Sequence, residues 1–223
     1  MKHARLFLAA AILCLVHSTV SNAQTLHIGP SAGWLHEMPS GQESGSGLTA
    51  GVIAETDFSK NGSGWFIDAG VMFEKKKWDS SGYFNNYYTP SAGDKKASVD
   101  TWHHTTYGLK IPVSAGYKLR LSSAVKLFGA VGPYLSIGIS GKSRLTTYIP
   151  SEGQYLEKQV SDNVYKDGLM NRIGWGIGAK AGAEIFGNCL VTVAYDHSMN
   201  EVFKQGFGTV KHRTLSVGLG YMF

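Results

Sequence analysis

The sequence predicts an all-β protein, an eight-stranded antiparallel up-and-down transmembrane β-barrel. Three observations predict it: eight stretches in which large apolar residues alternate with small or polar ones, connections that are alternately long and short, and a last strand that ends on an aromatic residue. Alternation with a period of two places one kind of side chain on each face of a strand. In a membrane barrel the apolar face meets lipid, and closure leaves no sheet edge unpaired.

Residues 1–23 are predicted to be a secretory signal peptide. The basic residues Lys2 and Arg5 precede an apolar run at residues 6–16. Ser21-Asn22-Ala23 then supplies the small residues that a signal peptidase recognises. The run is shorter than the roughly 18 apolar residues that a membrane helix needs. We therefore expect residues 24–223 to form the mature protein, a single outer-membrane β-barrel domain.

The composition argues against several classes of function. Removing Lys2 and Arg5 with the signal peptide lowers the formal net charge from +5 to +3, which is weak support for a nucleic-acid partner. Cys189 is then the only cysteine, which rules out an internal disulfide and a metal site built on cysteine pairs. We expect no nucleic acid, no cofactor and no metal.

The alternation places the strands, in chain order, as follows. They are predicted at residues 26–36, 47–58, 64–75, 102–119, 124–140, 170–185, 189–197 and 212–223. The outward apolar rows begin and end with Leu26 and Trp34, Leu48 and Phe58, Trp65 and Phe73, Tyr107 and Leu119, Val125 and Ile139, Ile173 and Ile185, Val191 and Tyr195, and Leu215 and Phe223. The last row is expected to close the barrel against residues 26–34.

The connections give the barrel a direction in the membrane. Residues 37–46, 78–101, 141–169 and 198–211 are long connections, whereas residues 59–63, 120–123 and 186–188 are short. Outer-membrane barrels have short periplasmic turns and long external loops, and an even strand number puts both termini on the periplasmic side. The sequence thus predicts a bacterial outer-membrane protein with extracellular long loops. A soluble lipocalin-like barrel, with the apolar rows turned inward, is the alternative.

The inward faces predict a network of charges inside the barrel. Parity places ten charged residues there: Glu55, Asp57, Asp68, Glu74, Lys110, Lys118, Arg172, Lys180, Glu184 and Asp196. Eight strands leave a lumen just wide enough for side chains, so we expect opposite charges to pair and plug it. A small-solute or ion pore is the alternative.

Three segments in the middle of the chain resemble a known family. Residues 107–113 (Tyr-Gly-Leu-Lys-Ile-Pro-Val), 115–119 (Ala-Gly-Tyr-Lys-Leu) and 128–134 (Phe-Gly-Ala-Val-Gly-Pro-Tyr) resemble the porin-like outer-membrane β-barrel domain family of Gram-negative bacteria. In that family a Tyr-Leu-x-Ile-Pro strand precedes an Ala-Gly-Pro-Tyr strand, and Gly108 departs from this pattern by one position. The resemblance extends over nearly all of residues 24–223 and implies a shape similar to the outer membrane protein X group.

The resemblance also implies how the chain reaches the membrane. The terminal row would be the insertion signal that the barrel-assembly machinery reads, and it consists of Leu215, Val217, Leu219, Tyr221 and Phe223. We expect a monomer surrounded by outer-membrane lipids, including lipopolysaccharide. Lys75, Lys76 and Lys77, with Lys211 and Arg213, could meet lipopolysaccharide phosphates, or could simply be solvated.

The functional expectation is a structural or surface-recognition role without catalysis. A possible recognition loop, residues 78–101, carries Trp78, Tyr83, Phe84, Tyr87 and Tyr88, and its ligand is not indicated by the sequence. These aromatic residues could instead pack on one another or rest on lipid headgroups. A lipid-modifying barrel enzyme is the second alternative. Its nearest motif is His197-Ser198, whose adjacent side chains point to opposite faces of a strand.

Overall fold

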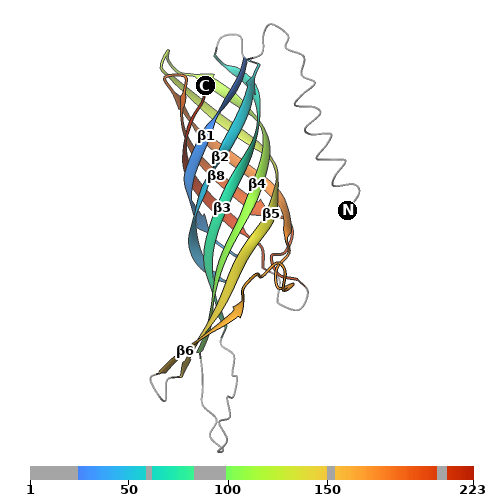
Figure 1. Cartoon of the computed structure of the whole chain (residues 1–223). Coiled ribbons are helices and arrows are strands. Elements are labelled where there is room, and N and C mark those ends of the chain that lie inside the picture. Colours follow the sequence, from blue (N-terminus) through green and yellow to red (C-terminus); the bar gives the residue numbers. More distant parts are fainter. Residues whose placement is uncertain (1–24, 59–61, 83–98, 150–153, 205–209) are drawn as a thin grey trace, which may run out of the picture.

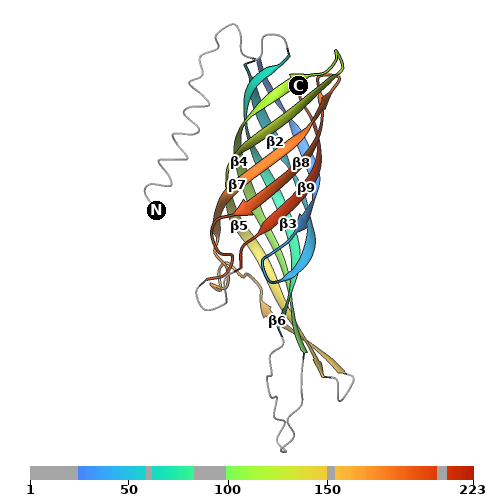
Figure 2. The same cartoon turned by 180° about the vertical axis from the view of Figure 1, so that it is seen from behind.

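The computed structural model describes residues 25–58, 62–82, 99–149, 154–204 and 210–223. One antiparallel sheet makes up the molecule, and it closes on itself as a tilted barrel (Figures 1 and 2). Its strands are β1 (Thr25–Glu37), β2 (Glu43–Asp57), β3 (Gly64–Gly82), β4 (Val99–Arg120), β5 (Val125–Ile149), β6 (Gln154–Ser161), β7 (Ile173–Ile185), β8 (Cys189–Ser198) and β9 (Arg213–Tyr221).

Eight of these strands form the closed ring. The order of neighbours is β1, β2, β3, β4, β5, β7, β8 and β9, and β9 returns to β1. At this seam Gly220 lies opposite Ser31, and Thr214 lies opposite Glu37. The predicted fold class and closing seam are confirmed, with the pairing shifted a few residues toward the end of β1. Closure satisfies the backbone of the first and last strands.

The outer wall of the ring is apolar. Large side chains of the predicted outward rows are exposed on it, among them Trp65 at 67% and Leu219 at 64%. Aromatic pairs border the wall near the chain termini, where Trp65 packs edge-on against Tyr117 with 5.5 Å between centroids. Near the opposite end Phe73 stacks on Tyr107 at 6.2 Å. Such aromatic belts are typical of membrane barrels.

The region described contains no helix long and apolar enough to cross a membrane.

The long connections contain more strand than the sequence predicted. β3 continues to Gly82, β4 begins at Val99, and β5 continues to Ile149 before the chain folds back as β6. The ninth strand, β6, was not predicted, and the predicted loops 78–101 and 141–169 were therefore too long. The outward residues of these extensions are polar, so the hydrophobic alternation stops where lipid stops while the backbone pairing goes on.

The extensions make one twisted sheet that stands beyond the barrel rim. We call it the projecting sheet; it consists of residues 78–82, 99–106, 141–149 and 154–161. Figure 1 shows β6 at the opposite end of the barrel from the carboxy-terminus. Within the described residues β6 pairs with β5 alone, so it is the edge of this sheet.

The short turns lie at the other end of the barrel, with the carboxy-terminus. Residues 186–188 join β7 to β8 as predicted, and there Phe186 and Gly187 both have positive φ, 53° and 76°. Glycine adopts that conformation without steric cost. The predicted turn at residues 59–63 lies partly outside the described residues, and the predicted signal peptide lies wholly outside them.

Candidate functional site

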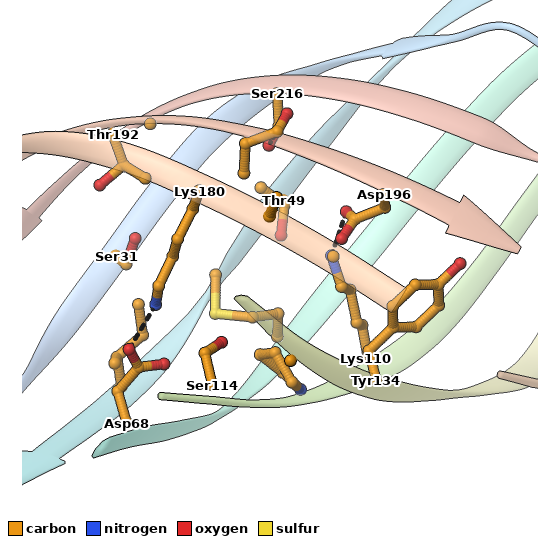
Figure 3. Close-up of a pocket in the computed structure, with 18 of the residues that line it drawn as sticks. Ser31, Thr49, Asp68, Lys110, Ser114, Tyr134, Lys180, Thr192, Asp196 and Ser216 are labelled. Carbon is orange, nitrogen blue, oxygen red and sulfur yellow. Dashed lines mark hydrogen bonds and ion pairs between the residues drawn. The ribbon is translucent and has the colours of Figure 1, made fainter. Parts of the chain in front are cut away.

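Two ion pairs cross the middle of the lumen. Lys180 on β7 reaches Asp68 on β3, with 2.7 Å between Nζ and Oδ2, and Lys110 on β4 pairs with Asp196 on β8. Figure 3 shows the four side chains pointing into the lumen from opposite walls. The remaining cavity between them has a volume of about 120 Å³. Pockets for small ligands usually measure about 300–1,000 Å³, so this space suits water rather than a ligand.

A second group of ion pairs lies nearer the carboxy-terminus and is centred on one buried lysine. The Lys118 ammonium contacts Glu55, and it lies 2.7 Å from a Glu184 oxygen and 3.9 Å from an Asp57 oxygen. Lys126 binds the other Glu184 oxygen at 2.6 Å. Three acids thus share Lys118, which is only 2% exposed. Buried charges persist when each has such a partner.

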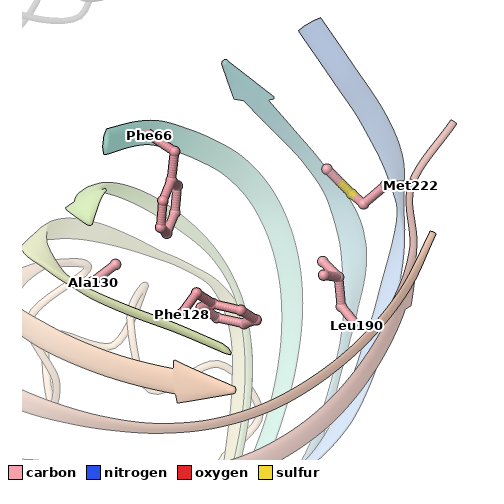
Figure 4. Close-up of a cluster of buried hydrophobic side chains, with 5 residues drawn as sticks. All are labelled: Phe66, Phe128, Ala130, Leu190 and Met222. Atoms are coloured by element: carbon pink, nitrogen blue, oxygen red, sulfur yellow. The ribbon is translucent and has the colours of Figure 1, made fainter. Parts of the chain in front are cut away.

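An apolar cluster fills the lumen beside the Lys118 group. It consists of Phe66, Phe128, Ala130, Leu190 and Met222, all buried (Figure 4). The Phe66 and Phe128 rings meet edge to face with 6.1 Å between centroids. The Lys118 ammonium lies 5.3 Å from the Phe66 ring centroid, which adds a cation–π contact. Large apolar side chains therefore occupy the inner face at this end of the barrel.

The opposite end of the lumen holds a third charged group. Glu37 is fully buried and accepts from Thr214 at 2.9 Å, and its carboxylate lies 3.2 Å from the Lys76 ammonium and 3.1 Å from His212. Lys76 also pairs with Glu74 at 3.1 Å. The sequence left two interpretations of Lys75, Lys76 and Lys77, contact with lipopolysaccharide phosphates or solvation at the surface. Lys76 fits neither, because the strand alternation continues and turns its side chain inward.

A cap of apolar residues covers the mouth above this third group. Trp78, Val164, Met170, Phe203 and Val210 are buried together there. They come from β3, from the segment between β6 and β7, and from the segment that follows β8. Trp78 was assigned to a recognition loop, but it is 2% exposed on β3 and points into the mouth. Alternation explains this position as well, since Trp78 shares the inward face with Lys76.

The segment between β6 and β7 is anchored to the barrel by backbone and ring contacts. Val164 donates its backbone N–H to the carbonyl of Gly141 at 2.9 Å. The Tyr165 ring lies against Gly138, where a side chain would approach its atoms within 2.2 Å. Burial raises the pKa of the Tyr165 phenol, against the opposing effect of its hydrogen bond to Thr106. The cavity of about 90 Å³ below this segment is again too small for a ligand.

His104 connects the mouth to the projecting sheet. Its Nε2 lies 3.1 Å from the Ser80 hydroxyl, and its Nδ1 lies 3.2 Å from the Ser143 hydroxyl. A neutral imidazole has one donor and one acceptor, and a hydroxyl can pair with either. Residues 101, 103 and 105, which alternate with it on the outward face, are polar, so His104 lies beyond the apolar wall. Burial lowers its pKa to about 4.

We expect His104 to titrate far below an ordinary histidine. An unfolded chain binds the proton near pH 6.5 and the folded protein only near pH 4, so the folding free energy that this group contributes is lost as the pH falls through that interval. The measurement is the His104 ring resonance by NMR, followed against pH in detergent micelles. A midpoint near 6.5 would contradict the burial.

The structure places all but one of the predicted interior charges in the lumen. Nine of the ten lie in the lumen and take part in the ion pairs described above, whereas Arg172 is exposed and lies just before β7. The predicted strand began too early there, at residue 170. Sequence reasoning missed Glu37, Lys76, Lys126 and His212. Applying the inward parity to every position of the predicted strands would have found Lys126 and His212, and extending it by one residue would have found Glu37 and Lys76.

The remaining predicted sites are placed as follows. Leu215, Val217, Leu219, Tyr221 and Phe223 form an exposed row on the outer wall, and their role in membrane insertion stays a prediction. Tyr83, Phe84, Tyr87 and Tyr88 lie outside the described residues. On β8 the Ser198 side chain is buried, and its hydroxyl donates to the Asn200 carbonyl at 2.8 Å, while His197 occupies the opposite face. Within the described ranges no group of three metal-ligating side chains occurs.

The chain is similar, at low sequence identity, to several solved structures. The Yersinia pestis attachment invasion locus protein Ail is 15% identical, with a TM-score of 0.36 and coverage of 88% of this chain and 98% of Ail. Neisserial surface protein A is 16% identical, with a TM-score of 0.39 and coverage of 90% and 99%. The N-terminal barrel domain of Pseudomonas aeruginosa OprF is 9% identical, with a TM-score of 0.34 and coverage of 88% and 97%.

No curated protein matches the chain. The family model of the outer membrane protein beta-barrel domain matches residues 22–204, most of the chain. The chain therefore belongs to the outer membrane protein β-barrel domain family.

Proposed function

We propose that the protein is a closed outer-membrane barrel that carries a recognition surface, the projecting sheet, on the outside of the cell. The observation that carries the proposal is the outer edge of β6, which pairs with no second strand among the described residues. An edge strand offers a row of backbone donors and acceptors to which an extended peptide can add as a further strand. The occupant we propose is an extended segment of another protein at the cell surface.

The side chains of β6 support this role. Tyr155, Leu156 and Val160 are 71%, 52% and 37% exposed, although natural edge strands usually avoid large exposed apolar residues. Glu157 and Lys158 lie between them and would set the register of a partner by charge. The Tyr155 ring stacks on Tyr148 of β5 with 4.6 Å between centroids, which holds the hairpin rigid.

The contents of the lumen support the closed barrel over the pore. Apolar side chains occupy it at one end, a cap covers it at the other, and ion pairs cross it between them. We propose that this arrangement excludes solutes, so that purified protein in a planar bilayer shows no stable conductance. Stable conductance steps would favour the pore.

The proposed orientation follows from the same architecture. The short turns and the carboxy-terminus lie at one end, and the projecting sheet lies at the other (Figure 2). Short turns face the periplasm in barrels of this kind. We therefore place the projecting sheet outside the cell and the carboxy-terminus in the periplasm.

Peptide capture tests the recognition surface. A library of short random peptides displayed on phage is panned against the protein in nanodiscs, and a photo-crosslinker on a cysteine reports where the selected peptides sit. Glu157→Cys combined with Cys189→Ser puts the crosslinker on β6, and labelling the natural Cys189 puts it at the far end as the matched control. We expect crosslinks from position 157 only.

Charge on the edge strand provides the second arm of this test. Leu156→Lys combined with Val160→Lys places lysines on β6, which is how natural edge strands discourage pairing. We expect the selected peptides to lose binding to this variant while the barrel stays folded. Crosslinking from position 189, or binding that survives both lysines, would overturn the proposal.

A further inference from the structure

The outer wall of the barrel carries a groove that the closed lumen and the projecting sheet leave unexplained. It has a volume of about 770 Å³ and crosses β9, β1, β2 and β3. Ala32 and Ala50 form its floor, while Leu219 and Phe73 rise on its two sides. The groove is an open depression in the wall, and its lining is almost entirely apolar. The wall is therefore not a uniform lipid-facing surface.

The strand register explains why the wall is hollow here. Leu219, Ala32, Ala50 and Phe73 lie side by side in one row across the four strands. The methyl groups of Ala32 and Ala50 lie in the middle, and the large side chains of Leu219 and Phe73 lie at the two ends, which makes a trough about as wide as one acyl chain. The next row toward the mouth consists of Val217, Trp34, Leu48 and Lys75. The large side chains of Trp34 and Leu48 stand where the two alanines stood in the first row, so they close the trough at that end.

The chemistry changes from apolar to cationic along the length of the groove. Lys75 lines it directly, and its ammonium lies 5.7 Å from the centroid of the Tyr107 ring in the aromatic belt. Lys77, two residues further along the outward face of β3, is exposed beyond the belt, in the row that also holds His36 and Ser46. An apolar trough that ends at an interfacial lysine pair fits an amphiphile with an acyl chain and a phosphate.

We infer that this groove is a binding site for one acyl chain of lipopolysaccharide, with a lipid A phosphate held by Lys75 and Lys77. The acyl chain lies over Ala32 and Ala50, and the phosphate lies at the level of the aromatic belt. Charge complementarity favours the phosphorylated lipid, because Lys75 is the one charged residue among the described residues that line the groove, and Lys77 follows it on the same face before the acidic pair of Glu43 and Asp79 is reached. The inference rests on the proposed orientation, which puts this end in the outer leaflet.

Native mass spectrometry of the detergent-solubilised protein tests the site, with diphosphoryl lipid A as the probe. We expect the wild-type protein to retain diphosphoryl lipid A in preference to dephosphorylated lipid A and in preference to phosphatidylglycerol. Lys75→Gln should weaken lipid A binding about fivefold, the usual contribution of one interfacial lysine. Lys142→Gln is the matched control, since Lys142 is exposed in the same row as Lys77 but two strands away from it.

Filling the groove tests the acyl-chain half of the site. Ala50→Leu should weaken lipid A retention, because its side chain occupies the trough and removes the packing contacts that the acyl chain would make there. Ala181→Leu is its control, because Ala181 is exposed on the outer wall of β7, away from the groove. Equal binding by all variants, equal retention of phosphatidylglycerol, or a dimer that Ala50→Leu dissociates would each overturn the inference.

Labelling of intact cells keeps this inference separate from the proposed orientation. A membrane-impermeant reagent should react with Glu157→Cys in the projecting sheet from outside. A lack of labelling would refute the orientation, and with it the assignment of lipopolysaccharide as the natural occupant. Loss of peptide binding at β6, in contrast, leaves lipid A retention unchanged.

Discussion

Replacing Lys118 by methionine will lower the free energy of unfolding of the barrel by about 3–5 kcal/mol. Methionine keeps the unbranched stem but removes the charge that Glu55, Asp57 and Glu184 share inside the lumen. Carboxylates left together in a buried space repel one another and lose their solvation. The cost comes mainly from these stranded acids rather than from the lost attraction.

Urea unfolding in detergent micelles, followed by heat-modifiable migration in gels, measures the effect of this substitution. Lys142→Met is the matched control, because the same change at an exposed position should alter stability by less than about 0.5 kcal/mol. Adding Glu55→Gln to Lys118→Met should recover part of the loss, since one stranded charge is then gone. A single variant as stable as the wild type would show that the lumen is hydrated enough to solvate the acids.

Replacing Phe66 by alanine will cost a similar amount, about 3–5 kcal/mol. The Phe66 side chain is 1% exposed, and its ring meets Phe128 edge to face within the apolar cluster. Alanine leaves a cavity beside Lys118 that the rigid barrel wall cannot fill by collapse. The change also removes the aromatic pair and the cation–π contact with the Lys118 ammonium.

The same unfolding experiment measures this second effect. Phe186→Ala is its matched control, because Phe186 is 76% exposed in a short turn and should lose little when truncated. The double substitution Phe66→Ala and Phe128→Ala should cost less than the sum of the two single changes, since the rings contact each other. Strict additivity would indicate that the two rings act separately.

The barrel could be predicted from the sequence because its walls follow one simple rule. Lipid demands apolar residues at every second position, and turns interrupt that pattern at regular places. The same rule assigned the inward positions of Lys180 and Asp68 correctly. It failed at Arg172, which lies before β7 begins at Ile173 and is exposed.

The positions at which the strands end could not be predicted from this alternation. Beyond the aromatic belt the outward face no longer meets lipid, so the outward residues of β3, β4 and β5 lose their apolar character while the strands continue. β6 alternates poorly for the same reason, and it was taken as loop. Trp78 was misplaced because its neighbours along the chain are polar, although its parity already pointed inward.

Alternation along the eight ring strands was enough to predict a membrane barrel with a charged lumen, because lipid on one side and a narrow interior on the other impose that pattern wherever a strand crosses the membrane. The pairing of the charges, the apolar side chains at one end of the lumen and the wall groove that ends at Lys75 became visible in the three-dimensional arrangement of the strands. These features depend on the register between strands, which sets the partner of every residue across the sheet. Register is set by the turns and by matching the hydrophobic patterns of two neighbouring strands, so one strand taken alone does not specify it.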